Sequence, residues 1–487
     1  MFDICNNAEY SEMQTNVAHT KQQTGGILDP RIKHVFVLML ENRSFDHMLG
    51  HSGLPGINGL AEGTWTNSDN DGEPVAAASE ASYSGDFDPD PGHDYYDVNL
   101  QLFGTHTPGA GVQADMSGFV KSYAEKCGGN ISRSHRIMKG FAPEKIPALV
   151  TLARNFAVCN RWFSSVPGPT LPNRLFAHCG TSGGRLDMSP EYFSGFRTVY
   201  EVLDRANVSA AVYSGGWSST ATFSFLLKNQ GSCFATLEDF YSDCDGDESD
   251  IPQYCFLEPR YSSGFVNERF LPQNDQHPDS DVRQGDKLIY SVYKAIRKNK
   301  KLWESSILVI TYDEHGGMYD HVVPGPISSP DGKTDLGFDF TRLGVRVPAV
   351  IVSPYIAPGT VSPLLFDHTS LIATARRQFT GIWQDETLGK RAAAANTFTV
   401  ASILNSPQLR LDDVLIPDPA PPPPSQAELP LNDLQRQHVL HAAFVDRQLP
   451  SDMRSGIDPK TVTTDHEADR YCGRVYALAA AATRGAK

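Results

Sequence analysis

The sequence lacks any apolar run long enough to cross a membrane. A membrane-spanning helix needs about 20 consecutive apolar residues, whereas the longest apolar runs, residues 34–40 and 345–356, have the length of strands. Residues 1–30 also lack the basic start and apolar block of a secretory signal. We therefore exclude transmembrane helices. The sequence as given predicts a cytoplasmic protein, or a secreted or periplasmic one if a signal was removed.

Positive charge is also scarce. Lysine and arginine together number 42 against 57 aspartates and glutamates, which gives a formal net charge of −15. Such a surface repels nucleic-acid backbones at long range, so we expect no nucleic-acid partner. The eight cysteines include no C-x-x-C pair, which argues against zinc ribbons and thioredoxin-like chemistry. Cys233, Cys244 and Cys255 could form one disulfide or remain free thiols.

Short apolar runs alternate with helical segments along the chain. The runs at residues 33–40, 307–312 and 347–352 predict strands buried on both faces. Residues 282–299 and 369–379 have the pattern of amphipathic helices. This alternation predicts an α/β fold, a three-layer α/β/α sandwich with a mostly parallel central sheet. Ligands of such sheets bind beyond the carboxyl ends of the strands, so functional residues are expected there.

Two acidic pairs follow predicted strands. Glu41 and Asn42 come directly after the first strand, and Asp313 and Glu314 after the strand at residues 307–312. Carboxylate and amide oxygens are ligands that Mg²⁺, Ca²⁺ and Mn²⁺ prefer. Carboxylates that converge at one sheet edge repel one another unless a cation binds or raised pKa values keep some of them protonated. This convergence favours a metal site. The alternative for each pair alone is a cap of the next helix.

A threonine precedes a predicted helix start. Pro172 is well placed as the first residue of a helix that continues to Cys179, so Thr170 is expected just before the helix N-terminus. Free N–H groups and the helix dipole favour an anion at that position. A hydroxyl held there beside a cation is a candidate nucleophile for a phosphoryl group. The alternative is a helix cap without a chemical role.

Four histidines lie in predicted loops or at element boundaries, namely His93, His277, His321 and His368. An imidazole at such a position can donate a hydrogen bond to a phosphate oxygen or protonate a leaving alkoxide. Each histidine could instead be structural.

Four ordered motifs resemble the phosphoesterase family of bacterial and plant non-specific phospholipases C and bacterial acid phosphatases. They are ENRSFDxxxG at residues 41–50, TxPNR at 170–174, DExGGxxDHV at 313–322 and GxRVPxxxxxP at 344–354. The resemblance spans roughly residues 33 to 380. A fifth family motif is altered, because residues 364–370 lack its hydroxyl residue and its tyrosine.

The resemblance implies an alkaline-phosphatase-like core with one divalent metal ion and a threonine nucleophile. The metal ligands that it implies are Glu41, Asn42, Thr170, Asp313 and Glu314. The implied catalytic residues are Thr170, His93 and His277, and the implied substrate-binding residues are Asn42, His321 and His368.

The resemblance and the composition together predict the domain organisation. Capping-box patterns at residues 432–435 and 464–467 predict two helices beyond the proline-rich stretch, which could dock on the core or form an appendage. The predicted division is an N-terminal extension (1–30), a phosphoesterase catalytic domain with long loop insertions (31–415), a Pro-rich linker (416–430) and a helical C-terminal segment (431–487).

The predicted function is metal-dependent hydrolysis of a phosphate ester through a phosphothreonine. We favour a phospholipase C that acts on phospholipid at a membrane surface. The alternatives are an acid phosphatase and a non-catalytic metal-binding protein. Because the net charge repels anions, we expect local attraction of phosphate by the metal, the histidines, and Arg43 or Arg174.

Overall fold

The computed structural model describes residues 28–60, 64–189, 195–223, 226, 233–383, 385–423 and 425–485, so most of the predicted N-terminal extension lies outside the described residues. An eight-stranded sheet runs through the described chain in the order β12-β4-β11-β10-β1-β7-β5-β6. Its strands are β1 (His34–Leu40), β4 (Ala157–Trp162), β5 (Ala210–Ser214), β6 (Phe234–Thr236), β7 (Tyr254–Glu258), β10 (Ser306–Tyr312), β11 (Ala349–Val352) and β12 (Thr360–Phe366).

The central strands β1 and β10 are parallel and buried along their whole length. Their register pairs Leu40 with Tyr312, so both strands end at the same level. Strand β7 runs parallel to β1 on its other side, and β11 alone is antiparallel to both of its neighbours. The sheet is therefore mostly parallel, as predicted, and the carboxyl ends of β1, β7 and β10 meet at one edge.

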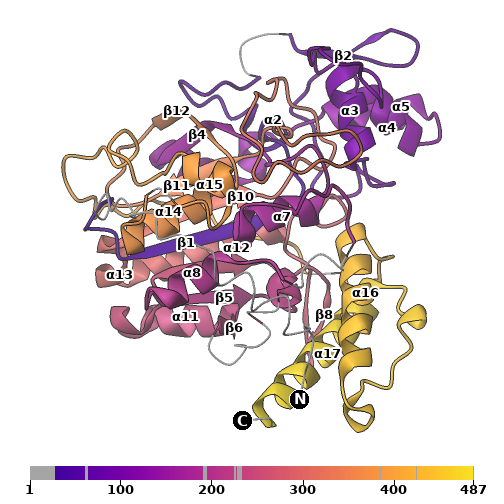
Figure 1. Cartoon of the computed structure of the whole chain (residues 1–487). Coiled ribbons are helices and arrows are strands. Elements are labelled where there is room, and N and C mark those ends of the chain that lie inside the picture. The colour runs from indigo at the N-terminus through magenta and orange to yellow at the C-terminus, as the bar shows by residue number, and fades with distance from the viewer. Residues whose placement is uncertain are drawn as a thin grey trace.

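Helices cover both faces of this sheet (Figure 1). One set packs together and contains α6 (Pro147–Asn155), α11 (Leu237–Asp245), α12 (Val282–Lys298) and α13 (Lys300–Glu304). A second set contains α7 (Thr170–Cys179), α8 (Val199–Arg205), α14 (Thr369–Thr380) and α15 (Gly389–Ala394). The three-layer α/β/α architecture is thus confirmed. Within the described ranges, no helix combines the length and apolarity needed to span a bilayer.

The long insertions contain more structure than the sequence indicates. Residues 215–286 contribute β6 and β7 to the central sheet. Cys244 in α11 and Cys255 in β7 are buried free thiols. The smaller elements are α2 (Phe45–Leu49), β2 (Thr66–Ser68), β3 (Pro74–Ala76), α3 (Tyr95–Phe103), α4 (Phe119–Lys126), α5 (Ile131–Ser134), β8 (Gly264–Val266) and β9 (Arg269–Leu271).

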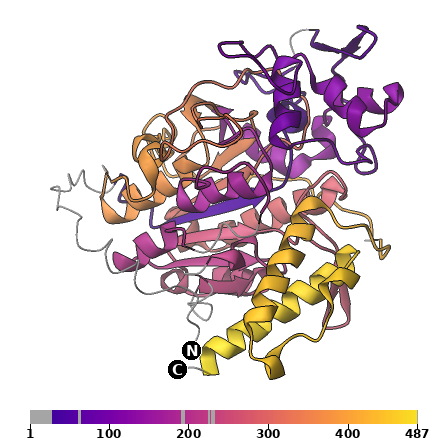
Figure 2. The same ribbon diagram turned by 45° about the vertical axis from the view of Figure 1, so that its right-hand side comes forward.

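The C-terminal segment forms two packed helices, α16 (Asp433–Gln448) and α17 (Asp465–Gly485), drawn in yellow beside the sheet in Figures 1 and 2. The capping box of α16 is present as predicted, with Asn432 and Gln435 exchanging hydrogen bonds. Leu434, Val439 and Tyr471 belong to the same buried cluster as β1 and β10. The segment therefore docks on the core.

Candidate active site

The two acidic pairs lie side by side where β1 and β10 end. The backbone N–H of Asn42 donates to Asp313 Oδ1 at 3.2 Å, and that of Arg43 donates to the Glu314 carbonyl oxygen at 3.0 Å. The side chains of Glu41, Asn42, Asp313 and Glu314 are all completely buried. Parallel pairing of the strands thus brings together the four residues that the sequence places at two separate strand ends.

Glycine permits the close approach of the two loops beyond these strands. Gly316 has φ +62°, and a Cβ atom there would lie 2.3 Å from the carbonyl oxygen of Asn42. Any other residue would collide with the backbone that carries Asn42. Glycine at this position therefore allows the loop after β10 to lie directly against the loop after β1.

Thr170 reaches the same point from helix α7. It is the first residue of the helix, after Pro169 at the N-cap position, so the helix begins two residues earlier than predicted. The Thr170 hydroxyl donates to Asn42 Oδ1 at 3.3 Å and is fully buried. The structure therefore brings Thr170 together with the acidic pairs at a helix N-terminus, where the helix dipole favours an anion.

Several buried polar atoms at this point have no hydrogen-bond partner among the described residues. They include Glu41 Oε2, Glu314 Oε1 and Asn42 Nδ2. Burial and the neighbouring Asp313 carboxylate raise the pKa of Glu41 well above its usual value, and burial raises that of Asp313 to about 6. Buried carboxylate oxygens without a hydrogen-bond partner in the described chain, on residues at one sheet edge, fit a hard divalent cation. The chemistry of the predicted ligands is therefore compatible with a metal ion.

The two arginines named in the sequence analysis have different surroundings. Arg174 Nη2 donates to Glu41 Oε1 at 3.0 Å, and its Nε donates to Asp313 Oδ2 at 3.0 Å. Arg43 Nε donates to the Gln276 carbonyl oxygen at 2.7 Å, and its Nη1 lies 3.0 Å from His47 Nε2. Arg174 thus neutralises carboxylates at the site, whereas Arg43 supports a neighbouring loop.

His93 and His277 lie together beside the acidic pairs, within a group of aspartates. His93 Nε2 lies 3.1 Å from Asp433 Oδ2. His277 Nδ1 lies 2.8 Å from Asp279 Oδ1, and its Nε2 lies 3.5 Å from Asp90 Oδ2 and 3.8 Å from Asp433 Oδ1. Asp433 therefore contacts both histidines.

The surrounding carboxylates favour the charged form of both rings. Burial lowers the pKa of His93, but Glu314 and Asp433 outweigh burial and raise it well above its usual value. Burial also opposes the charged form of His277, yet Asp279 and Asp90 raise its pKa well above its usual value. The neighbouring carboxylates thus stabilise the protonated, cationic form of both imidazoles.

His321 and His368 occupy other environments. His321 Nδ1 lies 2.6 Å from Asp46 Oδ2 and its Nε2 lies 2.9 Å from Asn58 Oδ1. His368 Nε2 lies 2.5 Å from the Asp313 carbonyl oxygen, and its Nδ1 accepts from the indole of Trp162. Protein groups bind all four ring nitrogens, and His368 contacts the backbone of Asp313 at the site. The substrate-binding role that the resemblance implies for both histidines stays a prediction.

The model of the Phosphoesterase family matches residues 32–380 of the sequence. The chain belongs to the phosphoesterase family. Non-specific phospholipase C6 of Arabidopsis thaliana is 37% identical over 415 residues, covering 81% of this chain and 76% of the relative. Non-specific phospholipase C5 of the same plant is 36% identical, covering 77% and 75%. Phospholipase C B of Mycobacterium tuberculosis is 27% identical, covering 78% and 80%.

Solved structures with some likeness include a protein in the alkaline phosphatase superfamily from Vibrio parahaemolyticus, at 14% identity and a TM-score of 0.32. The likeness covers 51% of this chain and 64% of that chain.

Asp433 lies outside the residues that match the phosphoesterase family model, and no sequence motif predicts a functional role for it. It is the first residue of α16, where an acidic residue commonly stabilises a helix N-terminus, so its type gave no sign of another role. Only the docking of α16 on the core places its carboxylate between His93 and His277.

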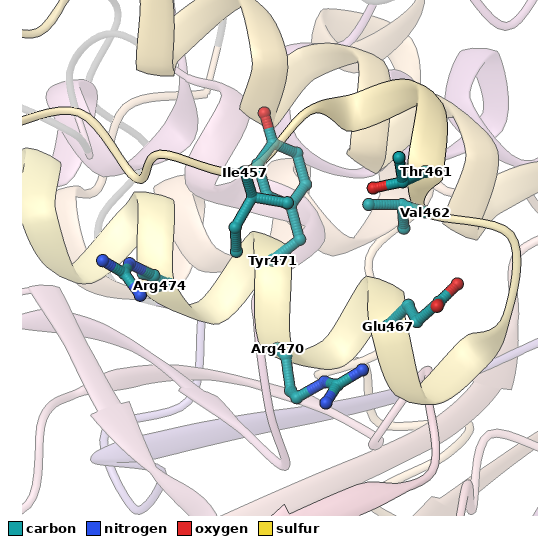
Figure 3. A pocket seen from close by; sticks show the side chains of 7 residues that line it. All are labelled: Ile457, Thr461, Val462, Glu467, Arg470, Tyr471 and Arg474. Atoms are coloured by element: carbon teal, nitrogen blue, oxygen red, sulfur yellow. The ribbon is translucent and has the colours of Figure 1, made fainter.

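A pocket in the C-terminal helices is separate from this site. Figure 3 shows that Glu467, Arg470 and Tyr471 of α17 line it, together with residues of the preceding turn. None of the residues predicted to bind metal or substrate in this phosphoesterase lines that pocket.

Proposed function

We propose that this phosphoesterase hydrolyses phospholipids by the phospholipase C reaction, through a phosphothreonine at Thr170. Membership of the family supports hydrolysis of a phosphoric ester bond, and the names of the relatives support a phospholipid substrate. The observation that carries the mechanism is the position of the Thr170 hydroxyl, which meets Asn42 at a helix N-terminus beside two acidic pairs.

In the first step, Thr170 Oγ1, after release of its hydroxyl proton to solvent, attacks phosphorus as an alkoxide, and the bond from phosphorus to the glycerol oxygen breaks. The N-terminus of α7 orients the non-bridging oxygens of the phosphate. His93 or His277, as imidazolium, gives its proton to the leaving alkoxide, which departs as diacylglycerol. The head-group phosphate remains esterified to Thr170.

In the second step, water attacks the phosphothreonine from the side of the departed alcohol. The histidine, now neutral, takes a proton from that water, and the bond from phosphorus to Thr170 Oγ1 breaks. The alkoxide and the imidazolium are thereby restored. A bound divalent cation would stabilise the alkoxide and neutralise charge on the phosphate. The residues proposed to hold it are Glu41, Asn42, Thr170, Asp313 and Glu314.

A comparison of two substrates with and without chelator tests this function. We expect wild-type protein to hydrolyse phosphatidylcholine in dispersion, to lose activity with EDTA, and to recover it with Mg²⁺, Ca²⁺ or Mn²⁺. Thr170→Ala should abolish turnover without loss of fold, whereas Thr105→Ala, at an exposed loop position, should remain active. Activity retained by Thr170→Ala would refute the assignment of the nucleophile.

The same assay includes a soluble phosphomonoester. Preferential hydrolysis of the monoester would identify an acid phosphatase instead of a phospholipase C. Metal binding without turnover of either substrate would favour the non-catalytic alternative.

A further inference from the structure

We propose that Arg174 is a positioning residue that fixes the orientation of the metal-binding carboxylates. This inference rests on the metal site of the proposed function. Arg174 is almost completely buried, and its guanidinium bridges Glu41 on the loop after β1 and Asp313 on the loop after β10. One rigid group therefore connects ligands from two different strand ends.

The bridge leaves one oxygen of Glu41 without a partner in the described part of the chain and fixes both oxygens of Asp313. Arg174 bonds Glu41 through Oε1, and Glu41 Oε2 is buried without a partner among the described residues. On Asp313 it bonds Oδ2, while Oδ1 accepts the backbone N–H groups of Asn42 at 3.2 Å and Glu314 at 2.8 Å. The carboxylates are thus held in defined rotamers before any cation binds. Such outer partners of metal ligands orient the ligands and strengthen metal binding.

A second layer of contacts holds Arg174 itself. Its Nη1 donates to the Tyr261 hydroxyl at 2.8 Å and lies 3.7 Å from Glu258 Oε1. Tyr261 in turn donates to Glu258 at 3.1 Å. Glu258, the last residue of β7, is fully buried and accepts from the hydroxyls of Ser218 and Ser219. The guanidinium therefore has little freedom to turn away from the metal ligands.

The position of Arg174 on α7 links this network to the nucleophile. Arg174 lies four residues after Thr170, so both side chains extend from the same face of the helix. The network thereby ties the nucleophile's helix to the ends of β1, β7 and β10.

A test must separate orientation from charge, because any cationic side chain also repels a metal ion. Arg174→Lys keeps the charge but loses the planar fork that bonds two carboxylates at once. Tyr261→Phe leaves every charge unchanged and removes only the hydroxyl that holds Arg174. Arg269→Lys, at an exposed position in β9, is the matched control.

The measurement is isothermal titration of Mn²⁺ into metal-free full-length protein, with circular dichroism to verify folding. We expect Arg174→Lys to weaken Mn²⁺ binding by about 10–100-fold. Tyr261→Phe should also weaken Mn²⁺ binding, by a smaller factor. This variant also tests the inference if Arg174→Lys fails to fold. Arg269→Lys should bind as the wild type does.

Unchanged or tighter Mn²⁺ binding by folded Arg174→Lys or Tyr261→Phe would overturn the positioning role while leaving the proposed function intact. A wild-type protein that binds no Mn²⁺, Mg²⁺ or Ca²⁺ would refute the metal site itself, and this inference with it.

Discussion

At the scale of single residues, the site is defined by how carboxylates are partnered. Glu41 and Glu314 keep buried oxygens without partners among the described residues, whereas Asp279 and Asp433 pair with histidines. The first arrangement suits a cation, and the second keeps imidazoles protonated. A carboxylate therefore suits a metal ion or stabilises a charged imidazole, and its neighbours determine which.

The contact between Asp433 and His93 predicts a change in pH dependence. Because the Asp433 carboxylate raises the pKa of His93, Asp433→Asn should lower that pKa. The proton donor would then be lost at a lower pH, so the alkaline limb of the kcat/KM profile should move to lower pH. Asp452→Asn, exposed in the same C-terminal segment, is the control. An unmoved alkaline limb in the folded Asp433→Asn variant would contradict the acid role of these histidines.

At the scale of elements, four motif residues form a buried network of polar contacts, namely Asp46, Asp320, His321 and Arg346. Arg346 Nη2 lies 2.9 Å from Asp46 Oδ1 in α2, and its Nε lies 3.2 Å from Asp320 Oδ1. His321 adds a contact of 2.6 Å to Asp46 Oδ2. The network fixes α2 to the loop after β10, next to the acidic pairs. Asp46, Asp320 and Arg346 therefore stabilise the fold beside the site.

Removal of one partner from this network should destabilise the protein. Arg346→Met leaves Asp46 and Asp320 buried without their cation, and breaking a buried pair in this way costs about 3–5 kcal/mol. Chemical denaturation should show this loss in the free energy of unfolding. Arg205→Met, at a mostly exposed position, should change it by less than about 0.5 kcal/mol. A loss equally small for Arg346→Met would refute a structural role of the network.

The sequence predicted most of the elements that position the site. The features that it did not predict share a physical cause. The strands at residues 34–40 and 306–312 and the helices at residues 282–298 and 369–380 were identifiable because local periodicity reports burial. The antiparallel direction of β11 and the place of β7 in the sheet were not, because strand direction and pairing depend on contacts distant in sequence. The role of Asp433 was not predictable either, because its contacts with His93 and His277 also join residues distant in sequence.

At the scale of the whole molecule, the charge distribution affects which membrane surfaces the protein approaches. The net charge is −15, and the partly exposed carboxylates of Asp90, Asp279 and Asp433 surround the buried His277. Both features repel an anionic bilayer at long range. A zwitterionic lipid surface carries no such penalty.

This charge distribution predicts a dependence on vesicle composition. We expect phosphatidylcholine hydrolysis to slow as phosphatidylglycerol is added to the vesicles, because electrostatic repulsion lowers the encounter rate. Added salt should restore the rate, since exposed charges are screened beyond about 8 Å at physiological ionic strength. Initial rates at several salt concentrations provide the measurement. Faster hydrolysis on the anionic vesicles would contradict the prediction.

The most direct test of the account is capture of the covalent intermediate. A soluble phosphocholine diester is mixed with metal-loaded protein, quenched with acid within the first turnover, and the digest is analysed by mass spectrometry. We predict a phosphocholine adduct on the peptide that contains Thr170, absent from Thr170→Ala and from chelator-treated protein. Turnover that leaves Thr170 unmodified, or an adduct on a histidine instead, would contradict the central claim.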